Sequence, residues 1–238
     1  MLFKRTFEKL FQRIWRLRTF QSTEQHQQRL AYLDSQKFIY QNSGLKTRIF
    51  SNLQKYRAFC LNEANKDGLL FEFGVFKGNS INQFAKCLQG SGDNRLIYGF
   101  DSFIGFSEDW TGVEKSYPKE HFDLNGKLPK VEPNVKLING FIEDTLETFL
   151  ANNSVEKTAF IHIDTDTYSP AKTVLSLLKP TMQTGTVILF DELCGYPNWR
   201  SHEYRALEEV FDKDEYEFIG FSQKNSNSNL IKAAIQIL

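Results

Sequence analysis

The sequence predicts an α/β protein with a doubly wound, mostly parallel seven-stranded sheet, a helical N-terminal extension and an antiparallel C-terminal hairpin. Two observations support this fold class. Residues 158–192 read as strand, helix and strand in a span so short that the strands are expected to be parallel neighbours joined by a right-handed crossover. From residue 68 onward apolar runs alternate with helical patterns, whereas residues 1–66 read as helices throughout.

The elements follow in a regular order, with a helical extension over 1–66 and the α/β domain over 67–238. The polar segment 222–229 is too short for a crossover, so it predicts an antiparallel hairpin. The aperiodic segment 104–134 is typical of a lid or binding loop. Strands are expected at 69–76, 96–103, 135–141, 159–163, 186–190, 216–221 and 230–238, and helices at 79–88, 143–150, 169–180 and 199–211.

The first 18 residues predict a basic amphipathic helix, with six basic side chains, one acidic one and an apolar face. Such a helix suits an anionic membrane surface. It equally suits packing on its own domain or on a second copy of the chain. Because tertiary packing usually stabilises such helices, docking is the favoured interpretation.

Composition excludes several classes of protein. Lys and Arg together number 29, as do Asp and Glu, and this zero net charge argues against a general nucleic-acid binder. No apolar run approaches the ~18 residues that a membrane span needs. Cys60, Cys87 and Cys194 form no CxxC pair, which indicates a reduced, cytoplasmic protein without disulfides.

The turn after the first strand of the domain indicates a nucleoside-type cofactor. Gly74 and Gly78 allow close approach of a ligand to the backbone, and Asp101 closes the next strand, where an acid commonly accepts hydrogen bonds from ribose. A plain tight turn explains the glycines alone. Phe76 replaces the middle glycine of a pyrophosphate motif, and Glu72 would repel phosphate, so the cationic S-adenosylmethionine (SAM) is favoured.

Carboxylates follow two neighbouring strands. Asp164 and Asp166 follow the strand at 159–163, and Asp191 and Glu192 follow the strand at 186–190. Parallel strands deliver these acids to one edge of the sheet, where they repel one another unless a cation lies among them. The alternative is a set of helix caps and surface charges, which suits Asp166 better than Asp191 and Glu192.

Together these motifs resemble a class I SAM-dependent methyltransferase, and more closely the macrocin O-methyltransferase family, which methylates sugar hydroxyls. The resemblance covers residues 68 to about 212. It rests on Glu72-x-Gly74-x-x-x-Gly78-x-Ser80, Tyr98-Gly99-Phe100-Asp101-Ser102-Phe103-x-Gly105, His162-Ile163-Asp164-x-Asp166-x-Tyr168-Ser169 and Phe190-Asp191-Glu192.

The resemblance implies a Rossmann-like sheet, a hydroxyl-bearing, sugar-containing small-molecule acceptor and a Mg²⁺ site formed by Asp164, Asp191 and Glu192. An all-oxygen ligand set suits a hard cation. The family usually has two adjacent aspartates, and Glu192 departs from this pattern. Asp166 is the leading candidate for the base, and His202 is its rival. Residues expected to bind SAM are Glu72, Gly74, Gly78, Ser80, Asp101, Ser102 and, at the adenine end, Gly140 and Phe141.

Two other functions stay open. Tyr168 and Lys172 match the Y-x-x-x-K pair of short-chain dehydrogenases that use NAD(P), although the glycine motif does not fit a pyrophosphate. A catalytically silent binding module, acting through the N-terminal helices, is the second alternative, because Glu192 departs from the metal motif. His162 reads as a buried core histidine.

Overall fold

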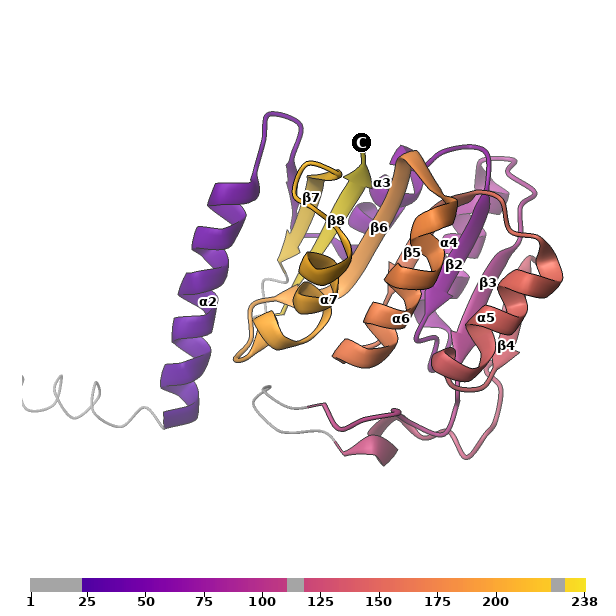
Figure 1. Ribbon diagram of the computed structural model, residues 1–238, viewed down its shortest axis with the longest axis horizontal. Coiled ribbons are helices and arrows are strands. Elements are labelled where there is room, and N and C mark those ends of the chain that lie inside the picture. Colours follow the sequence, from indigo (N-terminus) through magenta and orange to yellow (C-terminus); the bar gives the residue numbers. More distant parts are fainter. Residues whose placement is uncertain (1–22, 111–117, 224–229) are drawn as a thin grey trace, which may run out of the picture.

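A computed structural model describes residues 23–110, 118–223 and 230–238, so the helix expected over 1–18 lies outside the described residues. The strands form one sheet in the order β1-β7-β8-β6-β5-β2-β3-β4 (Figure 1). The strands are β1 Arg48–Phe50, β2 Leu69–Phe73, β3 Ile97–Asp101, β4 Val135–Asn139, β5 Thr158–Ile163, β6 Met182–Cys194, β7 Tyr216–Gln223 and β8 Ile231–Ile237.

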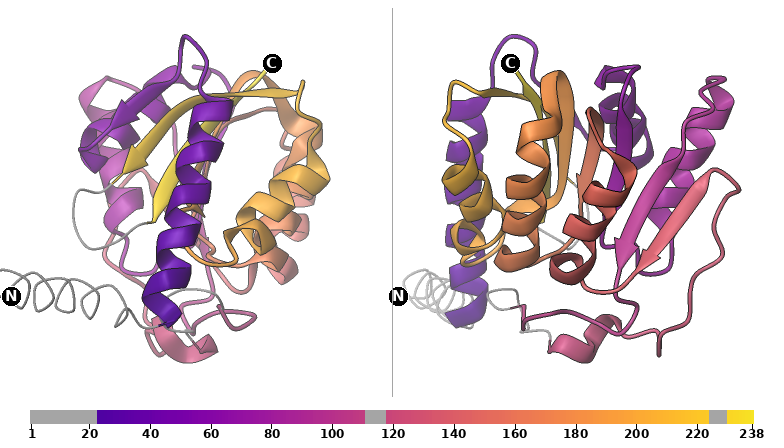
Figure 2. Two further views of the ribbon diagram at one scale, coloured as in Figure 1. Left: turned by 90° about the vertical axis from the view of Figure 1, so that its left-hand side faces the viewer. Right: turned by 45° about the vertical axis from the view of Figure 1, so that its right-hand side comes forward.

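Helices cover both faces of this sheet (Figures 1 and 2). Helices α3 and α4 pack on one face, and α2, α5, α6 and α7 on the other. The helices are α2 Thr23–Asn42, α3 Leu53–Glu63, α4 Asn79–Gly90, α5 Ile142–Asn153, α6 Tyr168–Leu178 and α7 Glu203–Val210, with short 3-10 turns η1 Lys119–Phe122, η2 Lys179–Thr181 and η3 Trp199–Ser201.

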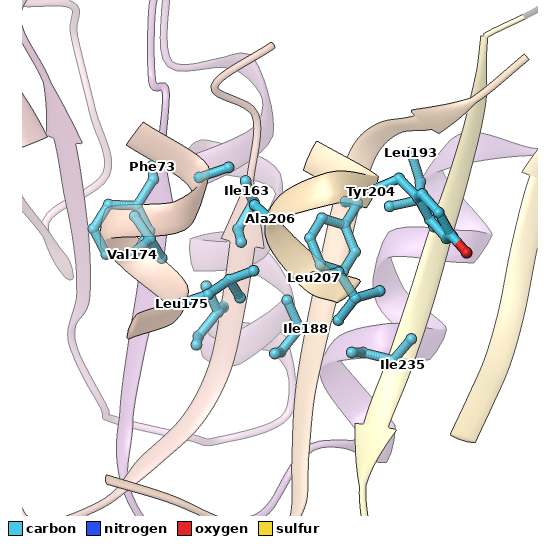
Figure 3. Close-up of a cluster of buried hydrophobic side chains, with 14 of the residues drawn as sticks. Phe73, Ile163, Val174, Leu175, Ile188, Leu193, Tyr204, Ala206, Leu207 and Ile235 are labelled. Atoms are coloured by element: carbon cyan, nitrogen blue, oxygen red, sulfur yellow. The ribbon is translucent and has the colours of Figure 1, made fainter. Parts of the chain in front are cut away.

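Apolar spacing explains how the helices meet the sheet. In α4, Ile81, Phe84, Ala85 and Leu88 recur at helical spacing and are buried, which gives one apolar face. The central strand β5 is buried at every position, as expected for a parallel strand covered on both faces. Figure 3 shows the core on the opposite face, where side chains of α6 and α7 pack over the sheet.

The predicted fold class is confirmed. Strands β2, β5 and β6 pair in parallel, as the crossover between 158 and 192 requires, and β8 pairs antiparallel with both β6 and β7. The sheet has eight strands, one more than predicted. None of the described helices is long and apolar enough to cross a membrane.

The additional strand corrects the expectation that residues 1–66 are helical throughout. Arg48–Phe50 forms β1 at the sheet edge and pairs in parallel with Gly220–Ser222 of β7. Three residues are too few to produce a period-2 pattern, so only the pairing partner, far along the chain, creates this strand. Helix α2 lies beside the same end of the sheet (Figure 2), with Phe38 in contact with Trp199 and Phe218.

Candidate active site

A pocket of about 180 Å³ lies where β2, β3, β4 and β5 end, the edge at which open α/β sheets bind ligands. The segment that leads from β3 to β4 passes along this edge, at the bottom of Figure 1. Among the described residues, the lining includes four carboxylates, those of Asp101, Glu143, Asp164 and Asp166, and no lysine or arginine. The pocket is therefore anionic.

Gly74 brings the ends of β2 and β5 together at the pocket. Its φ is +89°, and a Cβ at this position would lie 1.8 Å from the carbonyl oxygen of Asp164. Beside it, the N–H of Asp164 donates to Phe73 O over 2.8 Å, and the N–H of Gly74 donates to Phe100 O over 2.9 Å. Only glycine, which has no Cβ, allows the end of β2 to come so close to Asp164. This close approach places Asp164 at the pocket wall.

Asp101 shapes the turn that follows β2. Its Oδ2 accepts hydrogen bonds from the N–H groups of Val75 and Phe76, at 2.8 and 2.7 Å. Its Oδ1 accepts one from the N–H of Phe103 at 2.7 Å. Phe76 and Phe103 have φ values of +47° and +54°, which are uncommon for large side chains, and these hydrogen bonds stabilise them. The Asp101 carboxylate thus fixes the backbone of the turn that forms the pocket wall, and Asp101 itself lines the pocket.

The eight residues predicted to bind the cofactor separate into two groups. Those that line the pocket are Gly74, Asp101, Ser102 and Phe141. Those outside the lining are Glu72, Gly78, Ser80 and Gly140. Glu72 is fully buried behind the wall, where its carboxylate accepts a hydrogen bond from Ser80 Oγ at 3.0 Å. A cofactor role for this second group stays a prediction.

Sequence reasoning missed the aromatic wall of the pocket. Phe76, Phe106 and Phe122 line it, and their rings form a series with centroids 5.1 and 5.0 Å apart. Phe106 and Phe122 come from the aperiodic segment 104–134, which offers no periodic signal. The segment is predicted to be a lid or binding loop, and four of its described residues, Gly105, Phe106, Ser107 and Phe122, line the pocket.

Asp191 lies in a buried ionic network next to the pocket. Arg57 Nη2 of α3 approaches its Oδ1 to 3.2 Å, and Lys232 Nζ of β8 pairs with its Oδ2. His162 Nε2 lies 3.3 Å from the same carboxylate, while His162 Nδ1 lies 3.0 Å from Glu72. Burial opposes ionisation of Asp191, but Lys232, His162 and Arg57 outweigh it and hold its pKa well below the ordinary value.

The other carboxylates of the cluster behave in the opposite way. Burial, and then the charges of Asp191 and Glu192, raises the pKa of Asp164 well above its ordinary value. Burial, and then the charges of Glu192 and Asp164, does the same to the pKa of Asp166. Burial and the charge of Asp191 raise the pKa of Glu192 to about 7. These acids are crowded together with too few cations among them.

The structure brings the predicted metal ligands and the first base candidate into this cluster. Asp166 lines the pocket, with φ at +62°. His202 is buried at the start of α7, with its ring 6.0 Å from that of Tyr196, and lies outside the pocket lining. The metal and base assignments of these residues stay predictions. Sequence reasoning missed Arg57 and Lys232, whose partners are distant along the chain.

Tyr168 and Lys172, the pair expected of a dehydrogenase, lie outside the pocket lining. The hydroxyl of Tyr168 and the ammonium of Lys172 both bond to Glu209 of α7, and Arg205 completes the same surface cluster. Both side chains thus take part in the contact between α6 and α7, away from the pocket.

Comparisons with known proteins agree with this geometry. A curated relative, mycinamicin III 3''-O-methyltransferase of Micromonospora griseorubida, is 26% identical over 181 residues, covering 65% of this chain and 68% of the relative. Two solved structures of the calicheamicin methyltransferase CalS11 superpose with TM-scores of 0.58 and 0.54, at 20% and 24% identity. Each match covers 91% of this chain, and the two matches cover 93% and 95% of the respective CalS11 chains. At this level of identity the likeness shows the fold alone.

A family model, described as a methyltransferase domain, matches residues 71–193, more than half of the chain. This segment runs from within β2 to within β6 and includes the pocket lining and the acids of the cluster. The match confirms the predicted methyltransferase and leaves no support for the dehydrogenase alternative. The chain belongs to the methyltransferase domain family and has the class I fold.

Proposed function

We propose that this protein transfers the methyl group of SAM to a hydroxyl oxygen of a sugar-containing small molecule. The observation that carries the proposal is the anionic pocket at the ends of β2 to β5. A sulfonium and an α-amino group are cationic and suit the carboxylates of that pocket, whereas a pyrophosphate would be repelled by them. The aromatic side chains of Phe76, Phe106 and Phe122 offer apolar surface for adenosine.

The choice of acceptor follows from the relatives. The mycinamicin relative is named as a 3''-O-methyltransferase, and CalS11 as a TDP-rhamnose 3'-O-methyltransferase. Both names specify methylation of an oxygen, and the second places that oxygen on a nucleotide-linked sugar. A sugar hydroxyl with a neighbouring oxygen is therefore the proposed acceptor here.

We further propose that a divalent cation such as Mg²⁺ assists the transfer. The residues present suit one, because Glu192 Oε2 is buried without a hydrogen-bond partner among the described residues, and burial together with neighbouring carboxylates raises the pKa of Asp164 and Asp166. Oxygen ligands of this kind suit a hard cation. A bound cation would lower the pKa of the acceptor hydroxyl and fix its orientation. Asp164 and the acids at 191–192 supply the proposed ligands.

In the proposed reaction the protein's own residues position SAM and the acceptor. Gly74 and Asp101 shape the wall on which SAM would lie, and Asp166 or His202 would accept the hydroxyl proton as the oxygen attacks the methyl group. Holding the oxygen in line with the methyl carbon and sulfur can supply about 7–11 kcal/mol of the barrier reduction. Positioning is thus the main proposed contribution.

Calorimetric titration with S-adenosylhomocysteine (SAH), followed by assays with glycosides and nucleotide sugars, tests the proposal. We expect SAH to bind, and one sugar with free neighbouring hydroxyls to gain the mass of a methylene in the presence of SAM and Mg²⁺. Absence of SAH binding by folded protein would refute the proposal. SAH binding without turnover on any sugar of the panel would favour the silent binding module.

A further inference from the structure

Helix α2 is held to the rest of the protein by one face. Its buried residues, which define this inner face, are Gln28, Ser35, Phe38 and Ile39. Gln28 Nε2 donates to the carbonyl oxygen of Gly195 over 2.9 Å, and the N–H of Gly195 donates to Ser35 Oγ over 2.8 Å. These contacts fix which side of the helix points away from the domain. In the left-hand view of Figure 2 the indigo helix α2 lies in front of the rest of the molecule.

The opposite side of α2 is apolar and basic. Leu30, Leu33, Lys37 and Tyr40 follow one another at intervals of three and four residues, so they share one side of the helix, with Arg29 beside them. Leu30, Leu33 and Tyr40 are 52%, 55% and 86% exposed, and both cations are exposed as well. These five residues form the outer face of α2.

Exposed apolar side chains gather at this end of the molecule. Of the eight large apolar side chains that are exposed in the described parts of the chain, five lie between residues 30 and 49. Besides the three on the outer face of α2, they are Leu45 and Ile49. Exposed apolar residues scattered singly are ordinary, whereas a group of them is typical of a surface that docks on another molecule.

The chain that leads into α2 has the same character. Residues 1–18 carry six basic side chains against Glu8, and their apolar residues are spaced for one face of a helix. The acids of α2 itself are absent from its outer face. Glu24 and Asp34 lie on the flank beside residues 197–201, where Asp34 pairs with Arg200 at 3.1 Å. Apolar and basic residues without acids therefore describe both surfaces.

Charge distinguishes the possible occupants of the outer face. In a symmetric contact between two copies of the chain the face would meet itself, which brings Arg29 and Lys37 against the same cations of the other copy. Residues 1–18, which are strongly basic, would also meet like charges there. A membrane surface that contains anionic lipids complements both surfaces. Leucine and tyrosine side chains of such a helix enter the boundary between headgroups and acyl chains.

We propose that the outer face of α2, together with residues 1–18, binds the surface of a membrane that contains anionic lipids. Both parts lie before the segment matched by the methyltransferase domain, residues 71–193. The proposal is independent of the proposed reaction. Residues 1–22 join α2 at the bottom of Figure 1, on the side where the segment from β3 to β4 passes the pocket. A docked protein would therefore hold its pocket toward the headgroup layer.

Co-sedimentation of the full 238-residue chain with vesicles tests the proposal. The protein is expected to bind vesicles of phosphatidylcholine and phosphatidylglycerol in equal amounts. Vesicles of phosphatidylcholine alone should bind at least about tenfold more weakly, since each Lys or Arg near an anionic surface contributes about fivefold. High salt should weaken binding because it screens these charges. Equal binding to the two kinds of vesicle, or binding to neither, would overturn the proposal.

Reversal of the two cations on the outer face tests its charge. Arg29→Glu with Lys37→Glu should weaken vesicle binding by about 25-fold or more, since each cation contributes about fivefold. Lys66→Glu with Lys136→Glu is the matched control, because it changes the net charge equally. Both of these lysines are exposed, one between α3 and β2 and the other in β4, at the sheet edge opposite β1. The control should weaken binding by less than about fivefold.

Replacement of the two leucines tests the apolar part of the face. Leu30→Asn with Leu33→Asn should weaken vesicle binding by about tenfold or more. The matched control is Leu128→Asn with Leu238→Asn, whose leucines are 55% and 56% exposed elsewhere on the molecule, and it should bind as the wild type does. Calorimetry with SAH reports whether each variant is folded.

Two results with these variants would overturn the proposal. Unchanged vesicle binding in both α2 double variants would show that the outer face of α2 takes no part. Sedimentation velocity supplies the second result. If the wild-type protein is a dimer that Leu30→Asn with Leu33→Asn dissociates, a second copy covers this face.

Discussion

Replacement of Gly74 by alanine tests whether the close approach of β2 and β5 builds the pocket. In the variant, the new Cβ would lie 1.8 Å from the carbonyl oxygen of Asp164 and 2.7 Å from its carbonyl carbon. Both atoms belong to the backbone of the residue that follows β5, so no side-chain rotation can relieve the overlap. The ends of the two strands must move apart by about 1.6 Å, from 1.8 Å to the 3.4 Å at which ordinary contact begins.

The expected loss of stability has two parts. The left-handed φ of +89° costs a residue with a Cβ about 1–2 kcal/mol. Separation of the strand ends weakens two backbone hydrogen bonds, from Asp164 N–H to Phe73 O and from Gly74 N–H to Phe100 O, each worth about 0.5–1.5 kcal/mol. Together these effects lower the free energy of unfolding by about 2–5 kcal/mol.

Urea denaturation of Gly74→Ala measures this loss, and Gly92→Ala is its matched control. Gly92 has a similar φ of +73°, but a Cβ there would meet nothing within 4 Å. The control should lose only the conformational part, about 1–2 kcal/mol, and should bind SAH as the wild type does. Gly74→Ala should in addition weaken SAH binding. Equal stability and equal SAH affinity in the two variants would show that the approach of β2 to β5 does not shape the pocket.

Three further predictions concern other parts of the molecule. Asp101→Asn replaces one carboxylate oxygen by an NH2 group that cannot accept, so at least one of three backbone N–H groups loses its acceptor, which should cost about 1–3 kcal/mol in urea denaturation. Hydrogen bonds from Lys172, Tyr168 and Arg205 lower the pKa of Glu209 from 4.5 to about 2, so its stabilising effect is complete above pH 4.5 and is lost as the pH falls toward 2. Glu209→Gln should therefore reduce the decline in unfolding free energy between pH 5 and pH 2, and an unchanged decline would contradict this. Removal of divalent cations by EDTA should lower turnover by about tenfold or more and leave SAH affinity unchanged, whereas unchanged turnover would exclude metal assistance.

Periodicity was sufficient to predict the centre of the sheet. Strands such as Leu69–Phe73 and Thr158–Ile163 are continuous apolar runs bounded by turns, and their parallel order follows from a short crossover. The edge strand Arg48–Phe50 could not be predicted in this way, because its three residues are stabilised by β7 and not by a local pattern. Local signals therefore identify the strands that bury both faces, and they fail at the edge.

The site could be predicted as far as its residues follow strand ends. Gly74, Asp101 and Asp164 were identified from their positions, and all three line the pocket. Arg57 and Lys232 could not be found, since they lie 134 and 41 residues from Asp191 and belong to patterns that read as ordinary helix and strand. The sequence therefore predicted the acidic residues of the cluster but not the basic residues that pair with them.

The negative and positive charges of the cluster come from different parts of the chain. The acids belong to the segment matched by the methyltransferase domain, residues 71–193, whereas Arg57 and Lys232 lie before and after it. The helix α3 and the strand β8 thus supply the charges that neutralise Asp191 and leave Glu192 only partly paired. Residues outside the matched segment therefore help to keep a buried carboxylate of that segment ionised.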